Sequence, residues 1–241
     1  MTWIFKAISE LPASAPADVW QMDAREMGKK GLKRIVLPTD PPYYDAVPYS
    51  DLADFFYVWL RQSLSSIYPD LFNTLLTPKE QELVADRFRR GGKEKAKEYF
   101  EKGLADVFQE IRKITHPAYP FTVQYAFKQT ETDKSDGGAT NTASAGWETM
   151  LEALVKSGFC LTGTLPIRTE LSNRMRGHGS NALASSIALV CRPRPEDAPQ
   201  ATRRQFLIEL KHELPQALKM LQQGNIAPVD LAQASIGPGM A

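Results

Sequence analysis

The sequence predicts an α/β fold, and three observations support that prediction. A short apolar run, Ile35-Val36-Leu37, is ended by prolines, which is typical of a buried strand in an α/β sheet. Residues 49–68 place leucine and aromatic side chains at steps of three and four, the spacing of an amphipathic helix, and we expect this apolar stripe to pack on the sheet. Farther on, a helix over 147–157 is followed by two apolar runs, residues 159–168 and 184–192, which we predict to be strands.

Composition indicates an ordinary globular protein. The chain has 241 residues, of which 43% are apolar and 24% are charged, and its net charge is +1. Cys160 and Cys191 both lie within apolar runs, so we expect buried free thiols and a reducing, cytoplasmic environment. No apolar run approaches the ~20 residues that cross a bilayer, so no membrane segment is expected.

Other segments complete the predicted order of elements. We expect a helix over 3–11, a strand over 17–22, helices over 78–90 and 93–115, a strand over 119–128, and helix again from residue 200. This order predicts a main region, residues 1–197, in which 78–115 is a helical insertion. Residues 198–241 are expected to form a C-terminal helical extension that the end of the chain truncates.

The segment Asp40-Pro41-Pro42-Tyr43, here called the DPPY segment, follows the strand predicted at residues 35–37. Two prolines cannot donate ladder hydrogen bonds, so the strand must stop there, at the edge where open α/β sheets bind ligands. The prolines also stiffen the backbone carbonyls beside Asp40. A fixed carboxylate, a free carbonyl and the Tyr43 ring together suit a planar heterocycle that carries an exocyclic amine.

The DPPY segment resembles the catalytic motif of amino-group DNA methyltransferases, which methylate N6 of adenine or N4 of cytosine. Residues 39–45 and 49–56 together are closer still to a group of large prokaryotic adenine-specific DNA methylases, some of them associated with anti-phage defence. The resemblance implies a partial Rossmann-like, S-adenosylmethionine-dependent fold with a mixed sheet. It also implies that Asp40 and the Pro41 carbonyl bind the target amine, beside Pro42, while Tyr43 stacks on a flipped base. Cytosine-specific relatives often carry serine in place of this aspartate, so Asp40 favours adenine.

Asp23 has two interpretations that do not exclude each other. It resembles the acid that, one strand before the catalytic motif, reaches the adenine amine of S-adenosylmethionine in these methyltransferases. It is also placed to cap a helix, because Glu26 comes three residues later as in a capping box.

Contacts with DNA are predicted in the connection between the last two strands, which resemble the final antiparallel pair of a methyltransferase sheet. The candidate residues are polar or cationic and lie in a glycine-containing stretch: Arg168, Asn173, Arg174, Arg176 and Asn181. A merely basic hairpin loop is the alternative. His178 has no Cys or His neighbour at metal-ligand spacing, so no metal site is predicted. A second basic cluster, residues 87–97, suits either a phosphate backbone or a solvated helix surface.

A glycine-rich turn that would hold the methionine end of the cofactor is absent from the sequence. We therefore expect the chain to hold the half of a methyltransferase that binds the target amine, to bind S-adenosylmethionine poorly alone, and to need a cofactor-binding N-terminal half. Without that half, the strand before the DPPY segment should show an exposed edge or a hydrophobic gap. The alternatives are a DNA-binding module, one half of a split enzyme, or an enzyme that acts on an RNA or protein amine.

Overall fold

The computed structural model describes residues 2–11, 15–44, 47–125, 145–168, 185–223, 231–235, 237 and 240. The elements along these residues are α1 (Thr2–Glu10), the 3-10 helix η1 (Ala24–Lys30), β1 (Pro38–Thr39), α2 (Tyr49–Leu64), α3 (Lys93–Ile114), β2 (Phe121–Tyr125), α4 (Ala145–Lys156), β3 (Phe159–Arg168), β4 (Ser185–Pro193), α5 (Arg203–Gln223) and α6 (Leu231–Ala234). In this part of the chain, no helix is both long and apolar enough to cross a bilayer.

The sheet is mixed and has four strands in the order β1-β2-β4-β3. β1 runs parallel to β2, while β4 is antiparallel to both β2 and β3. The predicted α/β class is therefore confirmed. The two strands expected near the C-terminus also form the expected antiparallel pair, β3 over 159–168 and β4 over 185–193.

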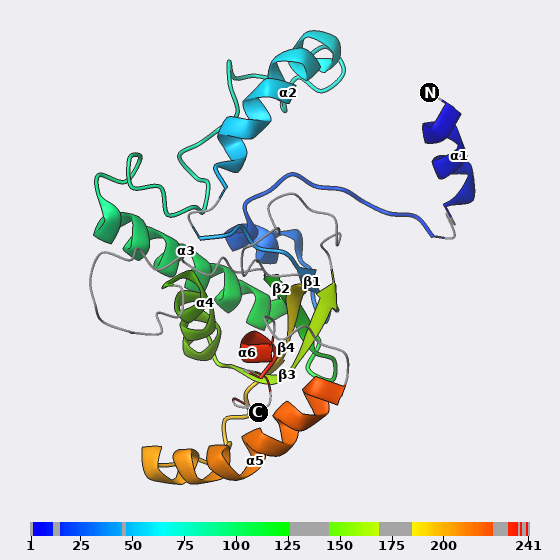
Figure 1. The fold of residues 1–241 in the computed structure, drawn as a ribbon. Coiled ribbons are helices and arrows are strands. Elements are labelled where there is room, and N and C mark those ends of the chain that lie inside the picture. The colour runs from blue at the N-terminus through cyan, green and yellow to red at the C-terminus, as the bar shows by residue number, and fades with distance from the viewer. Residues whose placement is uncertain are drawn as a thin grey trace, which may run out of the picture.

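The core lies between one face of the sheet and the helices α3 and α4 (Figure 1). α3 forms as predicted, and the stripe of Ala96, Phe100, Leu104, Phe108 and Ile111 is buried. On the sheet, the buried residues alternate along β2, so its apolar side chains all face these helices.

The turn from α4 into β3 shows why α4 ends where it does. Gly158 has φ of +79°, a left-handed conformation that closes a helix at low cost in glycine, and its N–H donates to the Val155 carbonyl at 3.0 Å. The Arg112 guanidinium on α3 donates to the Gly158 carbonyl at 2.5 Å, so the same turn is fastened to the core helix.

α2 forms where predicted, but our expectation that its aromatic stripe packs on the sheet was wrong. The helix projects away from the sheet (Figure 1) and exposes most of its large apolar side chains. These are Leu52, Phe55, Phe56, Val58, Trp59 and Leu60. Periodicity correctly gave α2 an apolar face, yet no part of the described chain covers that face. α1 likewise forms with its Trp3, Ile4 and Phe5 side chains exposed.

Three other expectations differ from the structure. Residues 17–22 form no strand but an extended, largely exposed segment before η1. Residues 78–90 form turns, not a helix, and hydrogen bonds from Lys79 and Arg89 to acids of α2 tie this segment to that helix. Of the strand expected over 119–128, residues 121–125 are strand, and residues 126–128 lie outside the described residues.

The core assignment predicts a large loss of stability when a central aromatic side chain is removed. Phe100 is fully buried on α3, whereas Phe88 is 83% exposed. Phe100→Ala should lower the free energy of unfolding by about 3–5 kcal/mol, measured by urea denaturation. The matched control, Phe88→Ala, should change it by less than about 0.5 kcal/mol. Equal effects of the two substitutions on the free energy of unfolding would contradict this assignment of the core.

Candidate functional site

The strand that leads into the DPPY segment lies at the edge of the sheet. It is anchored on its inner side, where the Ile35 N–H donates to the Ile114 carbonyl at 3.0 Å and the Thr122 N–H donates to the Leu37 carbonyl at 3.1 Å. On its outer side, Val36 is 61% exposed, and no described residue pairs with this edge. The expectation of an exposed edge is confirmed. The expectation of a buried strand over 35–37 was wrong, because the strand itself comprises Pro38–Thr39 and the residues before it have a neighbour on one side only.

The DPPY segment continues from β1 and is held by aromatic contacts. The Tyr43 ring meets the ring of Tyr125 on β2 edge to face, with 5.5 Å between centroids. The Tyr44 ring packs against Phe100 in the same manner at 5.1 Å, and its backbone N–H donates to the Tyr125 hydroxyl at 3.3 Å. Because Tyr125 is itself buried and stacked on Trp147, the segment is fixed to the core.

Gly146 makes this close approach possible. A Cβ atom at residue 146 would lie 2.7 Å from the Tyr44 Cβ and 3.2 Å from the Tyr125 hydroxyl. Any larger residue would push Tyr44 away from Tyr125 or displace the start of α4. The sequence carried no signal for this requirement, since the contact joins residues about 100 positions apart.

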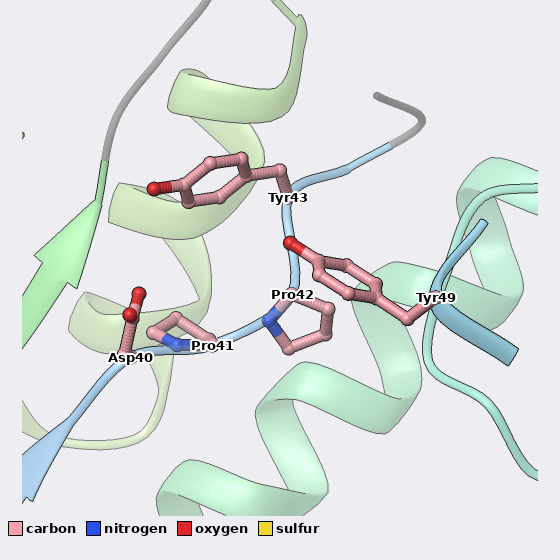
Figure 2. A pocket seen from close by; sticks show the side chains of 5 residues that line it. All are labelled: Asp40, Pro41, Pro42, Tyr43 and Tyr49. Atoms are coloured by element: carbon pink, nitrogen blue, oxygen red, sulfur yellow. The ribbon is translucent and has the colours of Figure 1, made fainter. Parts of the chain in front are cut away.

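A cavity of about 290 Å³ is lined by Asp40, Pro41, Pro42, Tyr43 and Tyr49. Figure 2 shows the Asp40 carboxylate and the Tyr43 ring on one side of the segment, while the Tyr49 ring reaches it from the other side. Asp40 is exposed, and no described residue forms a hydrogen bond or an ion pair with its carboxylate. The structure thus brings the four predicted catalytic residues together around the Asp40 carboxylate, a hydrogen-bond acceptor that has no partner among the described residues.

A second, larger cavity of about 720 Å³ shares Asp40, Pro41 and Pro42 as a wall. Asp23 and neighbouring residues of η1 line its far side, and α3 contributes an apolar floor of Leu104, Val107, Phe108 and Ile111. The two acids that the sequence singled out therefore border one cavity. No glycine is among the described residues that line it.

Asp23 also caps η1, so the capping interpretation is confirmed. Its carboxylate accepts from the Arg25 backbone N–H at 2.9 Å and from the Arg25 guanidinium at 2.5 Å. The hydrogen bond from the Arg25 side chain holds the pKa of Asp23 below its usual value, although desolvation opposes this. Glu26 does not complete a capping box, because its side chain pairs with Lys29 instead.

The start of α2 is held by a charged group that sequence reasoning missed. The Ser50 backbone N–H and hydroxyl both donate to Glu82, at 2.8 and 2.5 Å. Glu82 is paired with Arg89, which also binds Asp51. No local pattern reveals this cap, since 32 residues separate Ser50 from Glu82.

Part of the basic cluster at residues 87–97 is used by the fold. Arg89 and Arg90 are largely buried and paired with acids, Arg90 with Glu80 at 2.7 Å. The Arg90 guanidinium also stacks on Tyr99, 3.5 Å from the ring centroid. The charges of these two arginines are therefore already paired within the fold, and contact of the cluster with a phosphate backbone stays a prediction.

The predicted DNA-contacting residues fall almost entirely outside the part of the chain that the structure describes. Arg168 ends β3, at the start of the connection to β4. Asn173, Arg174, Arg176, His178 and Asn181 lie outside the described residues.

Comparison of the chain with models of protein families, with curated proteins and with solved structures gives no match.

The cap on α2 predicts a pH-dependent contribution to stability. Partial burial would raise the pKa of the Glu82 carboxyl, but hydrogen bonds from Ser50 and Arg89 outweigh it and bring the pKa below its ordinary value of 4.5. A carboxyl with a lowered pKa stabilises the fold above its unfolded pKa and loses that effect as the pH falls through its folded pKa. Glu82→Gln should therefore cost about 1–3 kcal/mol of unfolding free energy at pH 7.

The difference between wild type and Glu82→Gln should shrink steadily below about pH 4.5. Urea denaturation at a series of pH values measures it. Glu98→Gln, which alters an exposed acid on α3, is the control and should have little effect at any pH. A difference that stays constant down to about pH 3 would show that the charge of Glu82 is not what holds the helix.

Proposed function

We propose that this chain is the catalytic segment of a DNA methyltransferase that transfers the methyl group of S-adenosylmethionine to N6 of a flipped adenine. One observation carries the proposal. The rigid wall formed by Asp40, Pro41 and Pro42 is shared by two cavities, one containing the Tyr43 ring and the other containing Asp23. A reaction between two bound molecules needs their reacting atoms to be held close together, and these three residues are where the two cavities meet.

On the smaller side, the residues suit an adenine. The exposed Asp40 carboxylate and the Pro41 carbonyl accept the two hydrogens of the exocyclic amine, and the Tyr43 ring stacks on the base. These bonds direct the nitrogen lone pair away from the ring and toward the second cavity. The proton that the nitrogen loses passes to Asp40 and from there to water, because Asp40 is exposed. Positioning and electrostatics supply most of the rate.

On the larger side, the residues suit part of S-adenosylmethionine, whose chemical contribution is an electrophilic methyl group. A volume of about 720 Å³ lies within the range of cofactor sites. The apolar floor on α3 suits an adenine ring. Asp23 retains acceptor capacity for an amine beside Arg25, because a carboxylate has about four lone-pair sites. The methionine end is not matched, since it needs a backbone cradle and no glycine is among the described lining residues.

DNA is the proposed substrate because the sequence of the connection between β3 and β4 is rich in side chains that donate hydrogen bonds. Arg168, Asn173, Arg174, Arg176 and Asn181 offer side chains that bind phosphates or base edges. In this proposal they bind the duplex from which the adenine is flipped.

A second candidate function is one half of a split methyltransferase, and a separate observation favours it. The outer edge of β1 is open, and the apolar face of α2 is uncovered by any described residue. An open edge and an apolar surface of this kind bind another polypeptide. The partner would be a cofactor-binding half that adds a strand beside β1 and supplies the missing glycine-rich turn.

Methyl transfer from radiolabelled S-adenosylmethionine to unmethylated genomic DNA tests the proposal. The chain would be assayed alone and together with an N-terminal cofactor-binding half. Asp40→Ala should reduce transfer at least about 100-fold, because it removes the acceptor that orients the amine. Asp70→Ala, which alters an exposed acid outside both cavities, should leave transfer unchanged.

The outcomes separate the two candidates. Activity that appears only with the second polypeptide supports the split enzyme, and activity of the chain alone supports a self-sufficient catalytic segment. Equal transfer by wild type and Asp40→Ala would refute both.

A further inference from the structure

Two arginines and a histidine gather at the turn that precedes β2, residues 116–119, at the end of the sheet opposite the DPPY segment. Arg34 lies just before the residues that lead into β1, and its guanidinium is 3.1 Å from Nε2 of His116. Arg192 of β4 reaches the same turn and donates to the Ala118 carbonyl at 3.1 Å. No carboxylate of a described residue forms an ion pair with any of these three side chains. The turn therefore carries positive charge that the described part of the fold does not neutralise.

The His116 ring presents a hydrogen-bond donor toward Arg34. Its Nδ1 accepts the Ala118 backbone N–H at 3.1 Å, so the neutral ring carries its proton on Nε2. The Arg34 guanidinium is a donor only. Two donors therefore face each other 3.1 Å apart, and no described residue supplies an oxygen that accepts from both.

The backbone of Arg34 has a conformation that arginine seldom adopts. Its φ of +53° is left-handed, and no other non-glycine residue in the described ranges has a positive φ. The next residue is held on both sides, because the Ile35 N–H donates to the Ile114 carbonyl at 3.0 Å and the Ile35 carbonyl accepts from the His116 N–H at 2.9 Å. Glycine adopts a left-handed conformation without strain, so the fold alone does not favour arginine here. Strained residues of this kind cluster at binding and active sites.

We propose that Arg34 and His116 bind a phosphate group and that Arg192 adds a second positive charge beside it. The planar guanidinium matches phosphate through paired N–H donors. A phosphate has several acceptor oxygens around one phosphorus, so it accepts from Arg34 and from Nε2–H of His116 at once. None of the three residues lines either cavity, so this site is separate from the one proposed for methyl transfer.

Binding of inorganic phosphate to the full chain, followed by phosphorus NMR, tests the site. Arg34→Gly should weaken this binding about tenfold, because a hydrogen bond between charged groups is lost. Arg204→Ala is the matched control: it removes an exposed arginine of α5 and should bind phosphate as the wild type does. Acetate should bind the wild type less tightly than phosphate, because it has one charge and two oxygens.

Urea denaturation of the same variants separates binding from folding. Arg34→Gly should unfold at the same urea concentration as the wild type or at a higher one, because relief of the left-handed backbone offsets the greater freedom of glycine in the unfolded chain. A loss of stability in Arg34→Gly with unchanged phosphate affinity would show that Arg34 serves the fold, and it would overturn the site.

A nucleic-acid backbone and a small phosphorylated molecule both present this chemistry, and a duplex made only of G·C pairs distinguishes them. If the site holds one backbone phosphate, Arg34→Gly should lower the slope of log affinity against log salt by about 0.9. An unchanged slope together with weakened binding of inorganic phosphate supports the site and identifies a small phosphorylated ligand.

Two results would overturn the site, namely no binding of inorganic phosphate by the wild type, or equal binding by the wild type and Arg34→Gly. Neither result bears on the proposed methyl transfer, because these probes contain no adenine.

Discussion

The arrangement of the site depends on the contacts that Tyr125 makes. This buried residue of β2 meets the Tyr43 ring, accepts a hydrogen bond from the Tyr44 backbone and stacks on Trp147. β1 is only two residues long, and a strand so short cannot by itself fix the position of the DPPY segment. The aromatic contacts provide the rigidity that β1 lacks. They leave Asp40 at the junction of two cavities, in contact with solvent and with no described partner.

A second constraint is that the described chain does not cover its own apolar surface. α3 and α4 cover one face of the sheet, yet the aromatic residues of α2, the apolar side of α1 and the outer edge of β1 remain open. Large exposed apolar patches usually mark interaction sites. In our account the open surfaces and the missing glycine-rich turn have one cause, which is that a cofactor-binding polypeptide completes both the sheet and the larger cavity.

Local signals in the sequence predicted most of the regular elements. The bounds of α3, α4 and the two long strands after α4 were all predicted within a residue or two. The DPPY segment was recognised because its residues are adjacent in the chain. The grouping of its four residues around one cavity is a consequence of that adjacency.

Contacts between distant residues, by contrast, were not predictable. Periodicity gave α2 an apolar face, but whether another element covers that face is a tertiary property, and here none of the described elements does. The Glu82 cap on Ser50 and the closeness of Gly146 to Tyr44 join segments 32 and about 100 residues apart. For the same reason, the approach of Tyr49 to the DPPY segment could be recognised only in three dimensions.

The central claim is that the DPPY segment directs a methyl group to the amine of adenine in DNA. It is tested most directly by the chemical identity of the product. Genomic DNA is incubated with S-adenosylmethionine and with the chain together with a cofactor-binding N-terminal half. The DNA is then digested to nucleosides and analysed by mass spectrometry, and the Asp40→Asn variant is treated in parallel. Our account predicts N6-methyladenine with the wild type and none above background with the variant. Methyl groups on cytosine, RNA or protein instead of adenine, or N6-methyladenine in equal amounts from both proteins, would contradict it.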